Sequence, residues 1–279
     1  MANTHPANLG DVLKHLALCE AFSDQPERYQ ESHAGAPSYS LEGEKTGPGG
    51  IWDFIEMCRG SSLLRDSQYA HLQGSLPGTR DAPGTYLGSV GLAAAGLPAS
   101  VPLRVAELDA GTAGLLRKAL PAPRCCVIEG DGLSMIESDT RPGDLVLIDP
   151  FKMSRDTRSD AALDPVTAFI CAATTGARTL LWYPIHRPRQ ALAWMPQAWP
   201  RDTALPTRIE IRRTNTQAGL AGCGLLIAGL SEEAEERICS ITAAFGSALV
   251  NRWPKHRFFS MTSDGSCGNP LAPHIQGTG

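Results

Sequence analysis

The sequence contains no apolar run that approaches the roughly 20 residues a membrane-spanning helix needs. Its N-terminus also lacks the short basic region followed by an apolar stretch that marks a secretory signal. These two absences favour a soluble, cytoplasmic protein without a membrane partner. The 279 residues are 42% hydrophobic and 19% charged, which is typical of a globular chain that can bury a sizeable core.

Cysteine is present, but not in the spacing of a metal site or a disulfide framework. The eight cysteines are scattered with no C-x-x-C pair, and several lie within apolar runs. A free thiol in such a run behaves as a small hydrophobic group. We therefore predict neither a metal site nor disulfide bonds.

The chain has no excess of positive charge. It carries 25 lysines and arginines against 29 aspartates and glutamates, which gives a net charge of −4 and a pI of about 6.0. Proteins that bind nucleic acids usually present a basic face, so this balance argues against such a partner, although a local basic cluster would be compatible with one. A small-molecule substrate is the expected partner.

One short apolar run, Leu145 to Ile148, lies between residues that break regular structure. The turn Pro142-Gly143 precedes it, and Asp149-Pro150 ends it. A run of this length with such flanks is typical of a buried parallel strand. In open α/β sheets the ligand chemistry lies just beyond the carboxyl ends of the strands, which is where Asp149 falls. The alternative is an ordinary acidic residue at a strand end.

From residue 102 onward, apolar runs alternate with amphipathic segments. This alternation predicts a mostly parallel sheet with helices on both faces. The last two strands are close enough in sequence to pair as an antiparallel hairpin at the sheet edge. The predicted strands span 103–107, 124–128, 145–148, 179–184, 207–213 and 223–230, and the predicted helices span 110–120, 133–138, 161–175, 187–199 and 231–250.

The N-terminal segment 8–22 has apolar residues at the i, i+3, i+4 spacing of a helix with one buried face. Lys14 and His15 fall at the edge of that face, where a histidine is more often packed or solvent-facing than functional. Hydrophobicity alone does not predict a strand at 28–33. The alternation of Tyr29, Glu31 and His33 with Gln30 and Ser32 nevertheless permits one. The Ala34-Gly35-Ala36 sequence that follows allows the close backbone approach that a nucleotide-like ligand requires.

Residues 43–100 contain several glycine- and proline-rich turns and predict a loop-rich insertion with short helices, one of them over 51–58. A run of small residues from Val90 to Leu97 predicts a tightly packed helix, for which Ser89 would ordinarily serve as the N-cap. The polar tail from Thr262 is expected to be disordered.

Acidic residues recur at the carboxyl ends of the predicted strands: Glu107, Asp131 and Asp149. An acidic residue after the second strand of a nucleotide-binding sheet commonly accepts hydrogen bonds from ribose hydroxyls. Three carboxylates at one edge would repel one another without a donor-rich or cationic ligand. S-adenosylmethionine (SAM) meets this need better than NAD, because a pyrophosphate requires a glycine-rich helix start that the sequence lacks.

The chain resembles the bacterial 23S rRNA adenine methyltransferases of the RlmJ type. The similarity spans roughly residues 5 to 230, with the motifs in the family's order. D-V-L-K-H, H-A-G-A and L-W-Y-P are specific in combination, although each is weak alone. The matching stretches are His5 to His15, Ser32 to Ala36, Gly88-Ser89, Glu107-Leu108, Asp131-Gly132, Leu147 to Pro150, Leu181 to Pro184, and Gly224 with the apolar run after it.

The resemblance implies an α/β class I SAM-dependent methyltransferase fold, which is Rossmann-like, with a mostly parallel seven-stranded sheet and a helical insertion. It implies the division 1–42 (N-terminal helix and start of the SAM-binding domain), 43–100 (insertion), 101–261 (SAM-binding domain) and 262–279 (disordered tail). It also implies that Asp149 is the catalytic acidic residue at the transfer point. The residues implied to line the SAM site are His15, His33, Ser89, Glu107, Asp131 and Gly132, to which we add Lys14 and Trp182.

The catalytic motif departs from that of the family. The family has Asp-Pro-Pro-Tyr, in which the tyrosine stacks on a flipped adenine, whereas this chain has Asp149-Pro150-Phe151-Lys152. Stacking a base on an aromatic ring contributes ~1–3 kcal/mol, and flipping the base costs a few kcal/mol. Losing the ring at position 152 therefore removes a contribution comparable with the flipping cost. The SAM site is retained in the sequence, and the site for an RNA base is altered.

This departure favours a SAM-dependent enzyme of small-molecule, specialised metabolism. One form would methylate a small amine or hydroxyl. The other would cyclise SAM itself to azetidine-2-carboxylate and methylthioadenosine, as do the azetidine-2-carboxylate synthases, which this chain also resembles. Asp149 would accept the proton, and Phe151, Trp182 and Tyr183 would surround the sulfonium through cation–π contacts. For Trp182 and Tyr183, core packing at a strand end is the alternative.

Two other functions stay open. A 23S rRNA adenine methyltransferase with a degenerate motif would need a basic surface, for which the candidates are Arg155, Arg158, Arg187, Arg189, Arg212 and Arg213. A non-catalytic SAM-binding protein would have a blocked pocket or would bind SAM without turnover.

Overall fold

The structure is a computed structural model that describes residues 6–74, 76–120, 122–151, 153, 164–186, 199, 204–213, 220–254 and 258–263. The helix predicted near 187–199 and the first residues of the helix predicted at 161–175 lie outside these ranges, as does Lys152. Among the residues so described, no helix is long and apolar enough to cross a membrane.

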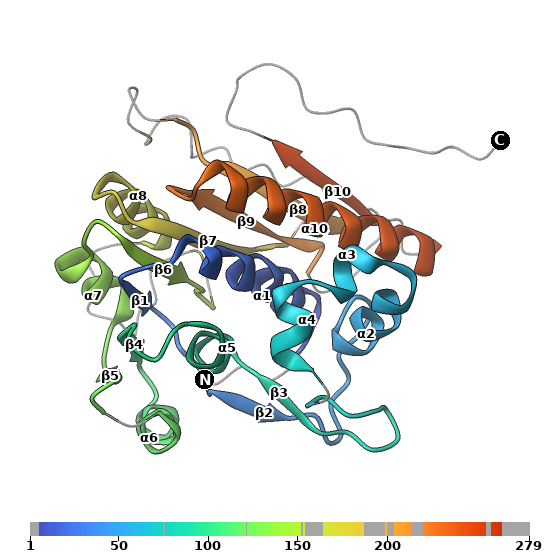
Figure 1. Cartoon of the computed structure of the whole chain (residues 1–279), viewed down its shortest axis with the longest axis horizontal. Helices are drawn as coiled ribbons and strands as arrows, with labels where there is room; N and C mark the ends of the chain where they lie inside the picture. The colour runs from blue at the N-terminus through green and yellow to red at the C-terminus, as the bar shows by residue number, and fades with distance from the viewer. Residues whose placement is uncertain are drawn as a thin grey trace.

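Strands and helices alternate through most of this part of the chain (Figure 1). The strands are β1 (Arg28–Glu31), β2 (Ser38–Ser40), β3 (Thr85–Leu87), β4 (Leu103–Glu107), β5 (Cys125–Glu129), β6 (Asp144–Ile148), β7 (Arg178–Ile185), β8 (Thr207–Arg213), β9 (Gly222–Ala228) and β10 (Phe258–Ser263). The helices are α1 (Leu9–Ala21), α2 (Ile51–Gly60), α3 (Ser62–Arg65), α4 (Gln68–Gln73), α5 (Ser89–Gly96), α6 (Ala110–Ala119), α7 (Gly132–Asp139), α8 (Pro165–Thr174) and α10 (Glu232–Arg252), with the 3-10 turn η1 (Phe22–Asp24).

The main sheet has the strand order β10-β8-β9-β7-β6-β1-β4-β5. Strands β5, β4, β1, β6 and β7 are parallel, and β9 runs antiparallel between β7 and β8. Without β10, this is the seven-stranded, mostly parallel sheet of the class I methyltransferase fold, so the predicted fold class and the β8–β9 hairpin are confirmed.

An eighth strand extends the sheet beyond the predicted edge. β10 pairs antiparallel with β8, with Thr262 opposite Ile209 and Ser263 opposite Arg208. The prediction of disorder from Thr262 onward was therefore wrong for these two residues, because the backbone of β8 offers them a ladder of hydrogen bonds that the polar sequence does not reveal.

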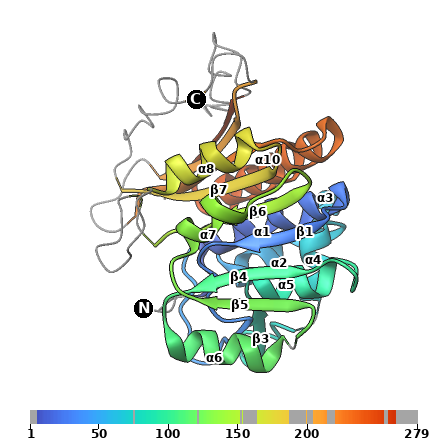
Figure 2. The same cartoon turned by 90° about the vertical axis from the view of Figure 1, so that its left-hand side faces the viewer.

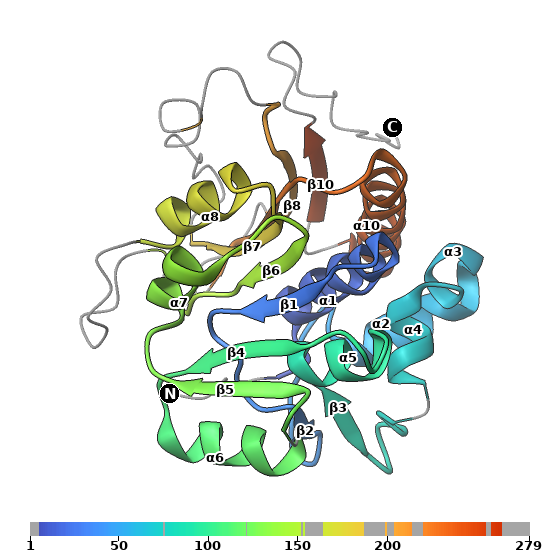
Figure 3. The ribbon, with the colours of Figure 1, turned by 60° about the vertical axis from the view of Figure 1, so that its left-hand side comes forward.

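Helices cover both faces of the sheet (Figure 2, Figure 3). One hydrophobic core lies between the sheet and α7 and α8, and a larger one lies between the sheet and α1, α5, α6 and α10. The short helices α2, α3 and α4 contact the outer sides of α1 and α10 (Figure 3). A separate two-stranded sheet pairs β2 with β3. The predicted division of the chain into domains stays a prediction.

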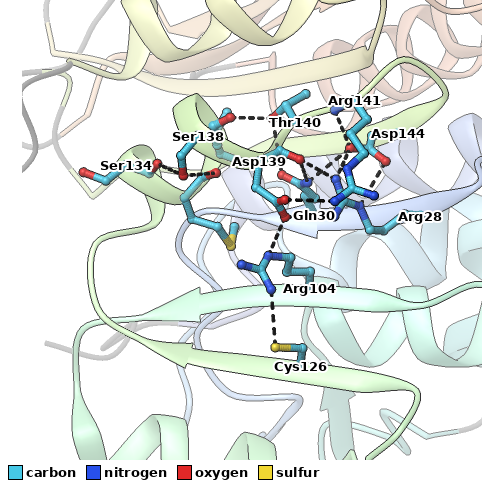
Figure 4. Close-up of polar contacts among 12 residues, drawn as sticks. Arg28, Gln30, Arg104, Cys126, Ser134, Ser138, Asp139, Thr140, Arg141 and Asp144 are labelled. Carbon is cyan, nitrogen blue, oxygen red and sulfur yellow. Dashed lines mark hydrogen bonds and ion pairs between the residues drawn. The ribbon is translucent and has the colours of Figure 1, made fainter.

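β1 lies at the centre of the sheet, between β4 and β6, although its sequence is polar. Figure 4 shows how the polar groups at its amino end are satisfied. Arg28 donates to Asp144 at 2.6 Å and to Asp139 at 2.8 Å, and Gln30 donates to Asp144 at 3.1 Å. Arg104 on β4 forms a 2.7 Å ion pair with Asp139. Polar residues tolerate this central position because each has a partner.

α1 is buried along nearly its whole length, so its sides are not divided into a core face and a solvent face. Asn8 begins the helix with a capping box, in which its side chain accepts from the backbone of Asp11 and the Asp11 side chain accepts from the Asn8 backbone. A Cβ atom at Gly10 would lie 2.9 Å from the Trp182 ring, so glycine allows the helix to approach β7 closely. The position of Lys14 and His15 within the core follows from this approach.

Candidate functional site

Lys14 and Asp149 meet in a short ion pair at the carboxyl edge of the sheet. The Lys14 Nζ atom, on α1, lies 2.5 Å from Oδ2 of Asp149, which directly follows β6, and 3.2 Å from Oδ1 of Asp11. Lys14 is buried, whereas 19% of the Asp149 side chain remains exposed. A ligand at this edge can therefore reach the carboxylate of Asp149. Lys14, in contrast, is enclosed by the protein.

The charges around Lys14 are predominantly negative. Burial disfavours the charged ammonium, but the attraction of Asp149, Asp11 and Glu31 outweighs it and raises the pKa of Lys14 above its usual value. Burial also raises the pKa of Asp11, which the charge of Lys14 opposes. Three carboxyl groups thus interact with one buried ammonium, an arrangement that favours the binding of a further cationic group.

Glu31 is a buried carboxyl group that the sequence analysis did not select. It ends β1, and its oxygens accept hydrogen bonds from the hydroxyl of Ser89 and, at 2.7 Å, from the hydroxyl of Tyr29. Burial raises the pKa of Glu31 to about 8. Ser89 is the first residue of α5, and Gly88 is the N-cap, so the expected capping role of Ser89 was wrong. Tyr29, Glu31 and His33 are alternate residues, whose side chains point to one side of a strand, and this spacing could have indicated Glu31 from the sequence.

His15 has one ring nitrogen directed into a chain of tyrosine hydroxyls. Its Nδ1 lies 2.8 Å from the Tyr86 hydroxyl, which accepts a 3.1 Å hydrogen bond from Tyr69. Burial, followed by the charge of Lys14, lowers the pKa of His15 well below its usual value, so the ring is neutral. Among the described residues, Nε2 has no hydrogen-bond partner.

Glu107 is fixed at the end of β4 by two backbone groups. Gly35 N donates to Oε2 at 3.0 Å, and Asp109 N donates to Oε1 at 2.9 Å. Gly35 has a φ of +58°, a conformation that glycine adopts readily, so the chain can turn at the residue that donates to Glu107. The carboxylate is held in one orientation with lone pairs remaining for a ligand.

Asp131 and Gly132 lie at the start of α7 and have clear structural roles. Asp131 is the N-cap, accepting from Leu133 N at 3.1 Å and from the Ser134 hydroxyl at 2.7 Å. A Cβ atom at Gly132 would lie 1.8 Å from the carbonyl oxygen of Ser32, so only glycine allows α7 to start so close to the loop after β1. Their predicted contact with the cofactor remains a prediction.

His33 and Phe151 lie nearer the surface. His33 is half-buried, and its Nδ1 is 2.7 Å from the Ser32 hydroxyl. Phe151 is 66% exposed, so described residues cover little of its ring. Its proposed role beside the reacting atoms stays a prediction.

The side chains of Trp182 and Tyr183 lie on different faces of the sheet. They are consecutive residues of β7, and their side chains point to opposite faces of the sheet, Trp182 toward α1 and Tyr183 into the core under α8. Tyr183 is 1% exposed, and its hydroxyl donates to the buried Glu210 at 2.7 Å. The expectation that both rings surround one sulfonium was therefore wrong, because adjacent strand residues alternate. Glu210 was not selected from the sequence.

Among the described residues, no three histidine, cysteine, aspartate or glutamate side chains are grouped to hold a metal ion. The polar groups that gather at the carboxyl ends of β1, β4 and β6 are instead carboxylates, one ammonium and neutral hydrogen-bonding groups. The fold is the α/β fold of the class I methyltransferases.

The solved structures similar to this chain include the DUF519-family protein LPL1258 of Legionella pneumophila, with a TM-score of 0.72 and 22% identity over 94% of this chain and 99% of that one. A probable spermidine synthase of Corynebacterium glutamicum gives a TM-score of 0.43 with 14% identity, over 91% and 75% of the two chains. The spermidine synthase of Thermotoga maritima gives 0.39 with 11% identity, over 84% and 62%. No family model matches the chain, and no curated protein sequence matches it.

Proposed function

We propose that the protein is a SAM-dependent enzyme of small-molecule metabolism. The observation that carries this proposal is the pairing of two aspartates, Asp11 and Asp149, with the single ammonium of Lys14. This excess of acidic groups suits a small cationic ligand at the edge where α/β sheets bind ligands. SAM carries two cationic groups, an ammonium and a sulfonium.

The residues present fit SAM at other points. Glu107, whose carboxylate is fixed at the end of β4, would accept hydrogen bonds from the ribose hydroxyls. The buried Nε2 atom of His15 has no hydrogen-bond partner among the described residues, and a polar group of the ligand would satisfy it. His33, Ser89, Asp131, Gly132 and Trp182 complete the proposed lining. Bound there, SAM would supply an electrophilic carbon beside a good leaving group.

Cyclisation of SAM is the preferred reaction, because it requires little besides a proton acceptor and exclusion of other nucleophiles. Asp149 accepts one proton from the α-ammonium, and Lys14 stabilises the charged form of Asp149 before the transfer. The freed nitrogen lone pair forms the bond to the γ-carbon as the bond from that carbon to sulfur breaks. The products are azetidine-2-carboxylate, neutral methylthioadenosine and one proton. Methylation of a small amine or hydroxyl would use Asp149 in the same way.

The alternative rRNA methyltransferase depends on an exposed basic surface. Of the six arginines considered for it, only Arg212 and Arg213 fall within the described part of the chain. Arg212 is buried, and its charge is paired with Glu210 at 2.7 Å. Arg212 therefore does not contribute to such a surface, and the altered motif Asp149-Pro150-Phe151-Lys152 is the reason that we prefer a small-molecule reaction.

The test is to incubate purified protein with SAM alone and to quantify the products by mass spectrometry. Equal amounts of methylthioadenosine and azetidine-2-carboxylate, well above the uncatalysed background and absent with Asp149→Asn, would support cyclisation. Intact SAM would exclude cyclisation, and methyl transfer to small amines or to transcribed 23S rRNA fragments would then identify the acceptor. Failure to bind SAM would overturn the proposal.

A further inference from the structure

Glu31 and Ser89 form a buried hydrogen-bonded pair between β1 and α5. The Ser89 hydroxyl donates to Oε1 of Glu31, and the Tyr29 hydroxyl donates to Oε2. Glu31 is completely buried, and Ser89 is 5% exposed. Glu31 therefore makes no contact with solvent, and its hydrogen-bonded route to a ligand runs through Ser89.

A serine hydroxyl has one hydrogen to donate and two lone pairs. When Glu31 is ionised, it takes the single hydrogen of Ser89, so toward any other group the Ser89 oxygen can then only accept a hydrogen bond. An accepting oxygen suits an ammonium group and does not suit a carboxylate.

We propose that Glu31 is a positioning residue that makes Ser89 a dedicated acceptor for the ammonium of the bound ligand. This inference rests on the proposed function, which places SAM at this edge of the sheet. It adds that the site distinguishes ligands that carry the methionine ammonium from adenosine compounds that lack it.

Binding of the ligand should also change the protonation of Glu31. Because burial raises the pKa of Glu31 to about 8, its carboxyl group is mostly protonated near pH 7 in the free protein. The other groups that act on it are Lys14 from α1, Asp149 after β6, Tyr29 on β1 and Ser89 from α5. A ligand ammonium beside Ser89 favours the ionised carboxylate, which accepts from both hydroxyls, so ligand binding at pH 7 should release a proton.

The test is calorimetric binding of SAM and of methylthioadenosine, which lacks the ammonium, to the full chain. Glu31→Gln and Ser89→Ala should each weaken SAM binding by roughly ten- to hundredfold and leave the methylthioadenosine affinity within about twofold. Because the two residues act as a unit, the double variant should bind SAM no more than about threefold more weakly than Ser89→Ala. Repeating the titration in buffers of different ionisation enthalpy should show proton release for the wild type but not for Glu31→Gln.

Glu20→Gln is the matched control. Glu20 is also a fully buried glutamate, but it accepts from Gln68 N on α4 and pairs with Arg237 on α10, away from this edge. Its substitution should lower stability and leave both affinities unchanged.

The outcomes separate the possibilities. Equal weakening of SAM and methylthioadenosine in Glu31→Gln would show general damage to the site and overturn the inference. So would unchanged SAM affinity, or effects of the two substitutions that multiply in the double variant. If the wild type does not bind SAM, the proposed function fails and this inference fails with it.

Discussion

The ammonium of Lys14 lies 2.5 Å from the carboxylate of Asp149, although the two residues are 135 positions apart in the chain. The contact joins the buried helix α1 to the end of β6. It gives Asp149 a permanent positive neighbour, and it leaves part of the carboxylate accessible to a ligand.

Asp149→Asn should bind SAM but lose activity by roughly 100-fold or more, since an amide cannot accept the proton. Lys14 keeps its contact with Asp11, so the protein should remain folded. The measurements are SAM turnover and a SAM dissociation constant. Asp164→Asn is the control, because Asp164 caps α8 and an asparagine can cap the helix in the same way. An unchanged turnover rate would remove Asp149 from the mechanism.

Glu107→Ala should weaken SAM binding by ~1–3 kcal/mol, the scale of a lost hydrogen bond to a charged group. Glu129 lies opposite Glu107 on β5 and pairs with Arg117 at an exposed position, so Glu129→Ala is the matched control and should leave the affinity unchanged. Equal dissociation constants for Glu107→Ala and the wild type would refute the ribose role.

Gly132→Ala should destabilise the protein by about 3 kcal/mol or more, because the new methyl group would collide with the backbone carbonyl of Ser32. At Gly130 the nearest atom to an added Cβ lies at 3.8 Å, so Gly130→Ala should be tolerated. Thermal or urea denaturation of both variants measures the difference. Similar stabilities would mean that the start of α7 can shift away from β1.

Tyr183→Phe should lower the free energy of unfolding by about 1–2 kcal/mol, since Glu210 loses one buried hydrogen bond while it keeps Arg212. Turnover of SAM should be nearly unchanged, because the hydroxyl is directed into the core. Loss of turnover at unaltered stability would instead restore Tyr183 to a catalytic role.

The raised pKa of Glu31 predicts a pH-dependent contribution to stability. Between about pH 4.5 and 8 the folded protein holds this proton and the unfolded chain releases it, so the stability contributed by Glu31 falls as pH rises. Glu31→Gln lacks this dependence. Its free energy of unfolding relative to the wild type should therefore rise from pH 5 to pH 8, by up to a few kcal/mol, in denaturation experiments. A constant difference would mean that Glu31 is ionised throughout.

The sequence by itself determined the fold class and the edge of the sheet where the polar groups gather. Short apolar runs alternating with amphipathic helices specify a parallel sheet, because each run must be buried on both faces. Glu107 and Asp149 could be placed at strand ends for the same reason, and the ends of parallel strands share one edge.

Only the tertiary structure decided which polar groups are partners. β1 could not be predicted from hydrophobicity, because the partners of Arg28 and Gln30 come from Asp139 and Asp144, far along the chain. The same holds for Glu31 with Ser89 and for Lys14 with Asp149. Burial makes a polar side chain depend on the partner it finds, and that partner is set by the packing of distant segments rather than by local sequence.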